Sequence, residues 1–228
     1  LDGTGTLSTY ALAADLEGFS IITTTSPANS RGIDIKGQWL CTLSKGKIKG
    51  LTGDGIRIVN NNSDADATGF LELDKFWVQG CGGWGVNVTD PTISSNAIGH
   101  IIYKQSYIVQ NTLGGLRLLG GQIKIEGGSI ANNGGPGLQI PYSATSGAPS
   151  LIDVERTEFD GNTGYHIDIR ACLGGTIKHS KFIYSANLTG IRIGDGVSGF
   201  VQDIKCENNH HRRDAGTVTL HSIGSNAQ

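Results

Sequence analysis

The stretch GLRLLGGQIKIEGGSIANNGGPGLQI, residues 115–140, contains the pattern that decides the fold of this 228-residue chain. It begins and ends with a glycine followed by an apolar, a polar and an apolar residue, and this glycine phrase recurs along the sequence. The copies are Gly32-Ile33-Asp34-Ile35, Gly55-Ile56-Arg57-Ile58, Gly85-Val86-Asn87-Val88, Gly115-Leu116-Arg117-Leu118, Gly137-Leu138-Gln139-Ile140 and Gly190-Ile191-Arg192-Ile193, with looser copies at His166-Ile167-Asp168-Ile169 and Val218-Thr219-Leu220. The eight middle residues span 185 positions (34 to 219), about 26 per repeat, a period typical of solenoid proteins.

A second segment with apolar residues at every other position lies between successive glycine phrases, as in a half-buried strand. Examples are Leu71-Glu72-Leu73-Asp74, Ile123-Lys124-Ile125-Glu126, Ile152-Asp153-Val154-Glu155 and Ile177-Lys178. Turns such as Asn132-Asn133 and Gly161-Asn162 then lead into the next phrase, because Asn and Gly tolerate left-handed backbone angles. Each repeat is therefore expected to contain a strand, a loop, a second strand and a turn.

This arrangement predicts an all-β protein, a right-handed single-stranded parallel β-helix of about eight rungs. Apolar side chains would stack inward, and polar ones would form outward columns with a spacing of about 4.8 Å. We expect one domain over residues 1–228, with an irregular first rung or cap at 1–31, regular rungs at 32–220 and a tail at 221–228. Surface loops are expected at 60–68, 89–99 and 141–149, which are rich in Asn, Ser, Asp, Gly and Pro.

Composition excludes several classes of function. The chain has 18 Lys and Arg residues against 20 Asp and Glu residues, and nucleic-acid binding usually needs a basic stripe. It has no apolar run of the length that crosses a membrane. The glycines recur with strands and never open a helix, so no nucleotide cofactor is expected. Cys41, Cys81, Cys172 and Cys206 are too far apart for a zinc site; buried free thiols are favoured, and disulfides stay open.

The middle residues of the glycine phrases would form one outward column, Asp34, Arg57, Asn87, Arg117, Gln139, Asp168, Arg192 and Thr219. Hydrogen-bonding groups at the spacing of neighbouring strands suit an extended polysaccharide, and arginine can contact uronate or sulfate groups with two hydrogen bonds. Arg117, Gln139 and Arg192 are therefore predicted substrate-binding residues. The alternative is a solvated sheet face with ion pairs between rungs.

The second strands place a further polar column, Asp74, Lys104, Glu126, Glu155, Lys178 and Gln202, in line. Glu126 and Glu155 would then be neighbours about 5 Å apart, near the carboxylate separation of a retaining glycosidase. Two adjacent carboxylates also raise one pKa, which supplies an acid beside a base. Glu126, Glu155 and Asp168 are the predicted catalytic residues. The alternative is a charge-balanced column of Lys, Glu, Glu and Lys.

Other residues support different interpretations. A lyase would need a base and a cation beside a uronate, which Lys178, His179, Arg117, Arg192 and Tyr103 could supply. Among the aromatics on neighbouring repeats, which include Tyr107, we predict that Trp77, Trp84 and Tyr103 stack on sugars, with core packing as the alternative. The segment His210-His211-Arg212-Arg213 is expected to form an exposed charged turn rather than a metal site.

The stretch 115–140, together with Val154-Glu155-Arg156-Thr157-Glu158-Phe159-Asp160-Gly161-Asn162-Thr163-Gly164, resembles the pectate-lyase-like superfamily of right-handed parallel β-helices. Within it, the chain looks most like the body of a bacteriophage tailspike or capsule depolymerase, and Asp2-Gly3-Thr4-Gly5-Thr6-Leu7 resembles strands near the start of such bodies. The resemblance covers about residues 30–220 and carries no shared catalytic motif.

This resemblance implies a homotrimer, outside the cell or on a virion tail, that binds and cleaves capsule or O-antigen polysaccharide. Carboxylate-catalysed hydrolysis is the leading expectation, because of the acidic cluster from Glu126 to Asp168. Cleavage by β-elimination, a non-catalytic binding or structural segment of a fibre or adhesin, and a secreted pectate lyase or uronate epimerase are the alternatives.

Overall fold

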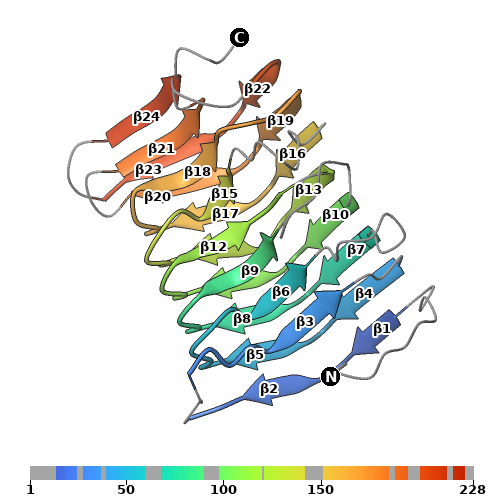
Figure 1. Cartoon of the computed structure of the whole chain (residues 1–228). Coiled ribbons are helices and arrows are strands. Elements are labelled where there is room, and N and C mark those ends of the chain that lie inside the picture. Colours follow the sequence, from blue (N-terminus) through green and yellow to red (C-terminus); the bar gives the residue numbers. More distant parts are fainter. Residues whose placement is uncertain are drawn as a thin grey trace.

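The computed structural model of the protein describes residues 14–24, 28–36, 40–59, 68–89, 98–119, 121–141, 151–184, 188–194, 201–214 and 218–223. Every regular element within these residues is a β-strand, and the strands form three parallel sheets of eight strands each (Figure 1). The fold is all-β as predicted and is consistent with a parallel β-helix. No helix in the described part of the chain is long and apolar enough to cross a membrane.

The three sheets, named A, B and C, take every third strand in chain order. Sheet A contains β1 (Ala14–Glu17), β4 (Leu40–Ser44), β7 (Thr68–Asp74), β10 (Ile98–Lys104), β13 (Gln122–Glu126), β16 (Leu151–Glu155), β19 (Gly175–Lys178) and β22 (Ile204–Glu207). Sheet B contains β2 (Ser20–Ile22), β5 (Lys47–Lys49), β8 (Trp77–Gln79), β11 (Tyr107–Val109), β14 (Ser129–Ala131), β17 (Glu158–Asp160), β20 (Lys181–Tyr184) and β23 (His210–Arg213). Sheet C contains β3 (Ile33–Lys36), β6 (Ile56–Val59), β9 (Trp84–Thr89), β12 (Gly114–Arg117), β15 (Leu138–Ile140), β18 (Tyr165–Ile169), β21 (Leu188–Ile193) and β24 (Val218–Ile223).

Each repeat has three strands where the sequence predicted two. The additional strand is the short one of sheet B, which lies in the segment that was expected to be only a turn. Strand β11, for example, has three residues, and only its central Ile108 is buried. One buried residue gives no alternating pattern, so these strands have no recognisable period in the sequence.

Sharp corners join sheet A to sheet B. After β4, β7 and β10 the chain turns at Lys45, Lys75 and Gln105, whose φ angles are 53°, 51° and 45°. The corner from sheet B to sheet C has left-handed residues too, including Asn132 (φ 54°) and Gly161 (φ 57°). The predicted role of Asn and Gly at the corners is confirmed at these two positions.

A column of buried asparagines follows the second corner inside the molecule, with Asn111, Asn133 and Asn162 on successive repeats. The side chain of Asn133 accepts from the backbone N–H and from Nδ2 of Asn111, at 3.0 Å in both cases. Its own Nδ2 donates to Oδ1 of Asn162 at 2.8 Å and to the carbonyl of Ile108 at 3.1 Å. These bonds satisfy polar groups that water cannot reach, and they tie the repeats to one another.

The glycine of the repeated phrase is explained by close packing inside this corner. A Cβ atom on Gly115 would lie 2.6 Å from Cγ2 of Ile130 and 2.4 Å from the carbonyl oxygen of Gly137. His166 occupies the equivalent place in β18; its Nε2 contacts the carbonyl oxygen of Ile183 at 2.9 Å. Burial lowers the pKa of His166 to about 4, so this imidazole is neutral in the folded protein at pH 7.

Strand register confirms most of the predicted columns and corrects two positions. Sheet A aligns Asp74, Lys104, Glu126, Glu155 and Lys178 as expected, but the next residue in line is Glu207 rather than Gln202. On sheet C, Arg192 pairs with Ser222, and Thr219 pairs with Thr189. Both errors lie at the end of the chain, where the sequence pattern is weakest.

The ends of the described chain are more regular than predicted. Strands β1 and β2 continue sheets A and B in register, and β24 extends to Ile223, into the predicted tail. The segment 210–213 is strand β23 and not a turn, because His211 packs inward on Phe182 with ring centroids 5.0 Å apart. The three predicted loops lie almost entirely outside the described residues.

The core is one continuous stack of Ile, Val, Leu and Phe side chains between the three sheets. Cys41, Cys81 and Cys172 are buried free thiols, and Cys206 is a half-buried one, as the sequence favoured. Burial raises the pKa of Cys41 and Cys172 to about 11, so these thiols are neutral and unreactive at pH 7.

Candidate functional site

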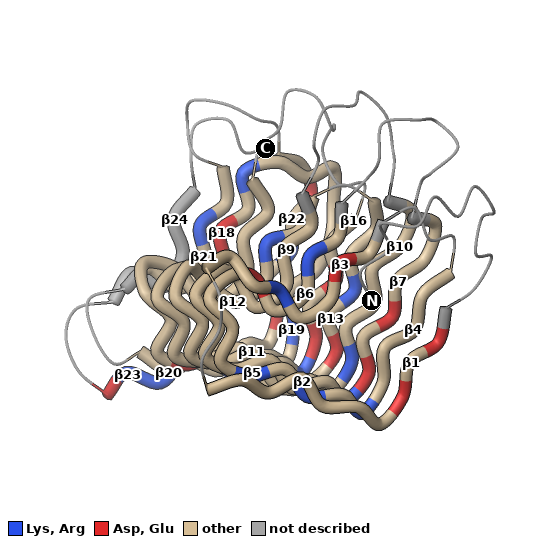
Figure 2. Tube along the Cα trace, turned by 60° about the horizontal axis from the view of Figure 1, so that its bottom comes forward, with Lys and Arg blue, Asp and Glu red and all other residues tan. Residues whose placement is uncertain are grey.

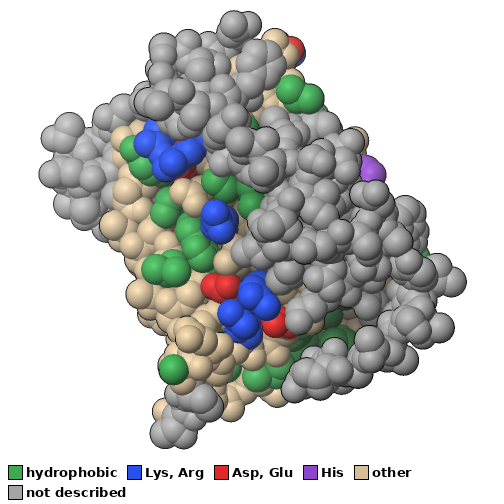
Figure 3. Space-filling view, in the orientation of Figure 1, with side chains coloured by type: hydrophobic (Ala, Val, Ile, Leu, Met, Phe, Trp, Pro, Cys, Tyr) green, Lys and Arg blue, Asp and Glu red, His purple; other side chains and the backbone are tan. Residues whose placement is uncertain are grey.

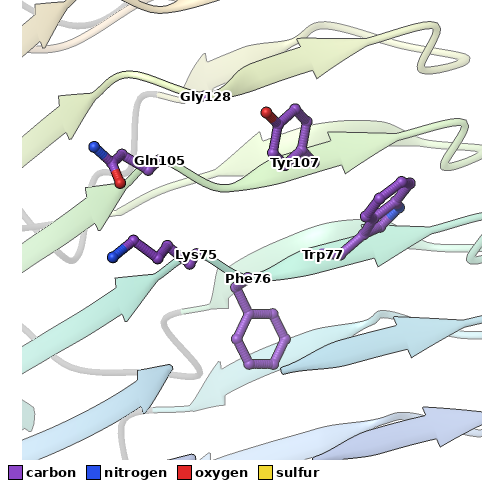
Figure 4. A pocket seen from close by; sticks show the side chains of 6 residues that line it. All are labelled: Lys75, Phe76, Trp77, Gln105, Tyr107 and Gly128. Carbon is purple, nitrogen blue, oxygen red and sulfur yellow. The ribbon is translucent and has the colours of Figure 1, made fainter. Parts of the chain in front are cut away.

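A surface hollow of about 470 Å³ lies at the corner between sheets A and B. Its lining residues are Lys75, Phe76, Trp77, Gln105, Tyr107 and Gly128. Figure 4 shows Lys75 and Gln105 on one side of this hollow and the rings of Trp77 and Tyr107 on the other. The two sides of the hollow therefore differ, with aromatic rings on one side and, on the other, polar side chains whose ends extend away from the rings.

The two aromatic side chains come from neighbouring strands of sheet B. Trp77 begins β8 and Tyr107 begins β11, and the strand register places them side by side. Their ring centroids are 5.6 Å apart, and Trp77 and Tyr107 are 42% and 48% exposed, respectively. Large aromatic groups are usually buried, so two adjacent exposed rings indicate a contact surface for a ligand.

Lys47 precedes this aromatic pair on the next strand, β5, in register with Trp77. Its Nζ atom lies 5.1 Å from the centre of the Trp77 ring, within the range of a cation–π interaction. Beyond Tyr107, the column continues with Ser129, whose side chain is small. Gly128, which has no side chain, also lines the hollow.

Of the three predicted sugar-stacking aromatics, only Trp77 is on this surface. Tyr103 is 1% exposed and lies in the core, so its prediction as a substrate-binding residue is wrong. It follows the inward alternation of β10, in register with Leu73 and Ile125. Trp84 is half-buried on sheet C, and its ring lies against the backbone of Gly114, where an added Cβ would be 2.1 Å away.

The predicted catalytic pair lies on the outer face of sheet A. Glu126 and Glu155 are register partners on β13 and β16, as expected, and their side chains are 30% and 21% exposed. The guanidinium of Arg156 pairs with both carboxylates, and its contact with Glu155 is 3.0 Å. Lys124 lies 3.2 Å from Glu126, and Lys178 lies 3.8 Å from Glu155.

Two of these cations affect the pKa of Glu126. Hydrogen bonds from Lys124 and Arg156 lower the pKa of Glu126 below its ordinary value, whereas the sequence predicted that one of the two carboxylates would be raised. At Glu126 the repulsion that would raise the pKa is offset because this carboxylate faces two cations as well as the neighbouring acid. A carboxylate with a lowered pKa suits a nucleophile or base and does not suit a general acid.

Sheet A as a whole carries alternating charges. Figure 2 shows acidic and basic residues side by side along its strands. The pairs include Lys45 with Glu17, and Lys104 with Glu72 at 2.8 Å. Most of this face is therefore charge-balanced, which agrees with the alternative that the sequence left open.

Asp168 is on a different face from Glu126 and Glu155. It belongs to β18 of sheet C, and its side chain is fully buried. Arg192 donates two hydrogen bonds of 2.7 Å to it, and Arg170 donates another at 3.1 Å. Asp168 therefore cannot act catalytically together with Glu126 and Glu155. It lies on a different sheet, and its side chain is buried, whereas theirs are partly exposed.

The outward column of sheet C is held together by its own side chains. Arg57 donates to both oxygens of Asp34 at 2.9 and 3.0 Å, and Gln139 donates to Asp168 at 3.3 Å. Arg117 contacts Asn87 at 3.5 Å and has no ion pair within the described residues. In Figure 3 this face shows small groups of basic and acidic side chains separated by hydrophobic ones. Arg117, Gln139 and Arg192 are thus in the predicted column, in contact with neighbouring side chains.

Sequence reasoning missed Lys47, Lys75 and Gln105 as neighbours of Trp77. A spacing signal for the sheet B column is nevertheless present. The first residue of each short strand follows the last residue of the preceding sheet A strand by three positions, as for Asp74 and Trp77, or Lys104 and Tyr107. Aligning the repeats on this spacing brings Lys47, Trp77, Tyr107 and Ser129 into one line.

Comparisons with known proteins assign no family. No family model matches the chain, no curated protein matches it, and no solved structure matches it. Among the described residues, no group of three or more His, Cys, Asp and Glu side chains is placed to hold a metal ion.

Proposed function

We propose that this protein binds an extended polysaccharide and that the hollow beside Trp77 and Tyr107 is one of its sugar contacts. The observation that supports this proposal is the adjacent, exposed pair of aromatic rings at one side of a hollow that polar side chains also line (Figure 4). A pyranose has the matching chemistry, because its C–H face is apolar and its edge carries hydroxyl groups.

The dimensions of the site agree with this ligand. A hollow of about 470 Å³ lies within the range of about 300–1,000 Å³ that is typical of small-molecule sites, and it can hold one or two sugar residues. Successive strands of the sheet lie about 4.8 Å apart, so a sugar chain along the stack meets equivalent positions at a regular interval. Gln79 and Gln110, hydrogen-bonded to each other at 2.8 Å, lie beside the aromatic column and offer further polar contacts.

Replacing the aromatic pair tests the proposal. In affinity electrophoresis or calorimetry with a panel of bacterial capsule and O-antigen polysaccharides, Trp77→Ala or Tyr107→Ala should weaken binding about tenfold, because the stacking contact is lost. Leu173→Ala is the matched control, since Leu173 is similarly exposed (46%) but lies away from the hollow. Equal affinity of all variants would show that the sugar binds elsewhere.

Hydrolysis of the bound chain is the second candidate function, and the register of Glu126 with Glu155 favours it. Both carboxylates are partly accessible, and the low pKa of Glu126 suits a nucleophile or base. Arg156 would have to release one of them, because it now pairs with both. Elimination remains the alternative reaction, with Lys178 and His179 beside Glu155.

A cleavage assay distinguishes these reactions. If the pair is catalytic, Glu126→Gln and Glu155→Gln should each abolish the release of new reducing ends while the fold is retained, and Asp153→Asn on the same face should not. Products with the ultraviolet absorbance of an unsaturated sugar would identify a lyase. Full activity in both glutamine variants would exclude the pair, and the absence of any cleavage by the native protein would favour binding alone.

From the resemblance to phage tailspike bodies, we also propose that the chain is a right-handed β-helix, that three copies assemble, and that the protein acts outside the cell or on a virion tail. Exposed aromatic and charged columns along the sheets are compatible with this setting. The binding site proposed above lies within one chain and does not depend on the assembly.

A further inference from the structure

The surface around the aromatic pair has an uneven distribution of charge. In each of β5, β8, β11 and β14 the central residue is buried, and the flanking side chains are Lys47, Lys49, Trp77, Gln79, Tyr107, Val109, Ser129 and Ala131. None of these is acidic. The corner residue Lys75 adds a further positive charge at the wall of the hollow.

These lysines differ from those of sheet A. Within the part of the chain that the structure describes, Lys47 and Lys49 form no ion pair, whereas Lys104 and Lys124 of sheet A each contact a carboxylate directly. Lys75 is 54% exposed, and its Nζ atom is 3.9 Å from Asp74, at the outer limit of an ion pair. The hollow is therefore bordered by positive charge that side chains of this protein largely leave uncompensated.

The first acidic residues of sheet B lie on β17, two strands after β11. Glu158 and Asp160 of β17 follow Ser129 and Ala131 in register. Two strand spacings separate Tyr107 from Glu158, about 10 Å. A negative group on a bound sugar is thus favoured near Lys47 and Lys75 and disfavoured near β17. The two ends of this part of sheet B therefore differ in their attraction for an anion.

We propose that the sugar in contact with Trp77 and Tyr107 carries a carboxylate or another anionic group, and that Lys47 and Lys75 select acidic over neutral polysaccharides. This inference rests on the proposed polysaccharide binding and adds the class of its substrate. The aromatic rings contact the apolar face of the sugar. The ammonium group of Lys47 over the Trp77 ring and that of Lys75 at the other end of the hollow provide positive charge for its anionic substituent. An ammonium group contacts carboxylate, sulfate and phosphate without geometric preference, so the lysines specify charge and not one particular sugar.

Matched pairs of polysaccharides test this inference. Polygalacturonate, alginate and hyaluronan, each beside its carboxyl-reduced form, present the same backbone with and without charge; dextran and pullulan represent neutral chains. We expect binding to at least one acidic polymer, weakened by salt and lost in its reduced form. Lys47→Gln and Lys75→Gln should each weaken that binding about two- to fivefold and reduce its salt dependence.

Lys181→Gln is the control, because Lys181 is in the same column of sheet B but pairs with Glu158 at 2.9 Å. Its affinity should equal that of the native protein. Equal binding of charged and reduced polymers, with no effect of the two lysine variants, would overturn the selectivity and leave polysaccharide binding intact. Binding to none of the polymers, nor to the capsule and O-antigen panel, would overturn both proposals.

Discussion

Buried Asn133 illustrates how one residue can serve three repeats. Its amide accepts from Asn111 and donates to Asn162 and to the carbonyl of Ile108, which lies on a neighbouring strand. The sequence Asn132-Asn133 therefore combines two roles. The first asparagine takes the left-handed corner angle and is exposed, and the second enters the interior.

Replacing Asn133 by alanine should lower the free energy of unfolding by about 3–5 kcal/mol, because buried donors and acceptors on three repeats lose their partners. Asn132→Gly is the adjacent control and should be nearly neutral, since glycine adopts the same positive φ. Urea unfolding followed by circular dichroism measures both. A loss below 1 kcal/mol for the alanine variant would mean that water replaces the asparagine amide.

Asp168 shows why residue type alone did not identify its role. Its position in the glycine phrase predicted an outward carboxylate, and the register confirms that position. The side chain is nevertheless fully buried by Arg192, Arg170 and Gln139. The charge of Asp168 is buried together with these three donors, so its role is to hold them in place, because a buried carboxylate needs such partners.

At the scale of the element, the glycine phrase encodes a strand and the corner before it. The apolar residues of the phrase face the core, while the glycine passes close to an inward side chain of sheet B. In β12 this contact involves Gly115 and Ile130. The glycine is therefore needed for packing space rather than for an unusual backbone angle.

Gly115→Ala should destabilise the protein by about 1–3 kcal/mol, because the new methyl group overlaps Ile130 and the carbonyl oxygen of Gly137. Gly174→Ala is the control: nothing lies within 4 Å of an added Cβ there, and its change in stability should be near zero or slightly favourable. Thermal unfolding of the two variants compares them directly. Equal stability would show that sheets B and C can move apart at this corner.

The short strands of sheet B mark the limit of prediction at this scale. Long strands of sheets A and C alternate over four or more residues, and the sequence locates them. A strand such as Trp77–Gln79 contains one buried residue between two outward ones, which resembles many loops. Its identity depends on pairing with Lys47–Lys49 and Tyr107–Val109 on either side.

For the whole molecule, the three sheets have different outer surfaces. Sheet A carries paired charges, and sheet C carries polar side chains that satisfy one another. The first half of sheet B carries exposed aromatics with Lys47 and Lys49, which form no ion pair among the described residues. A ligand that binds to a surface must compensate for the side-chain contacts that it breaks. This free-energy cost is smallest where the side chains have few partners. The proposed binding surface is on sheet B for that reason.

The sequence by itself determined the all-β class, the repeat length, the inward residues of two sheets and the neighbouring positions of Glu126 and Glu155. These features are periodic, and period is a local property of the chain. Only the tertiary structure decided the third sheet, the burial of Tyr103 and Asp168, and the cations around the glutamate pair. Each of these depends on which strands and side chains from other repeats occupy the surrounding space. The three-residue spacing of the sheet B strands is recognisable only once the strand ends are known from the structure.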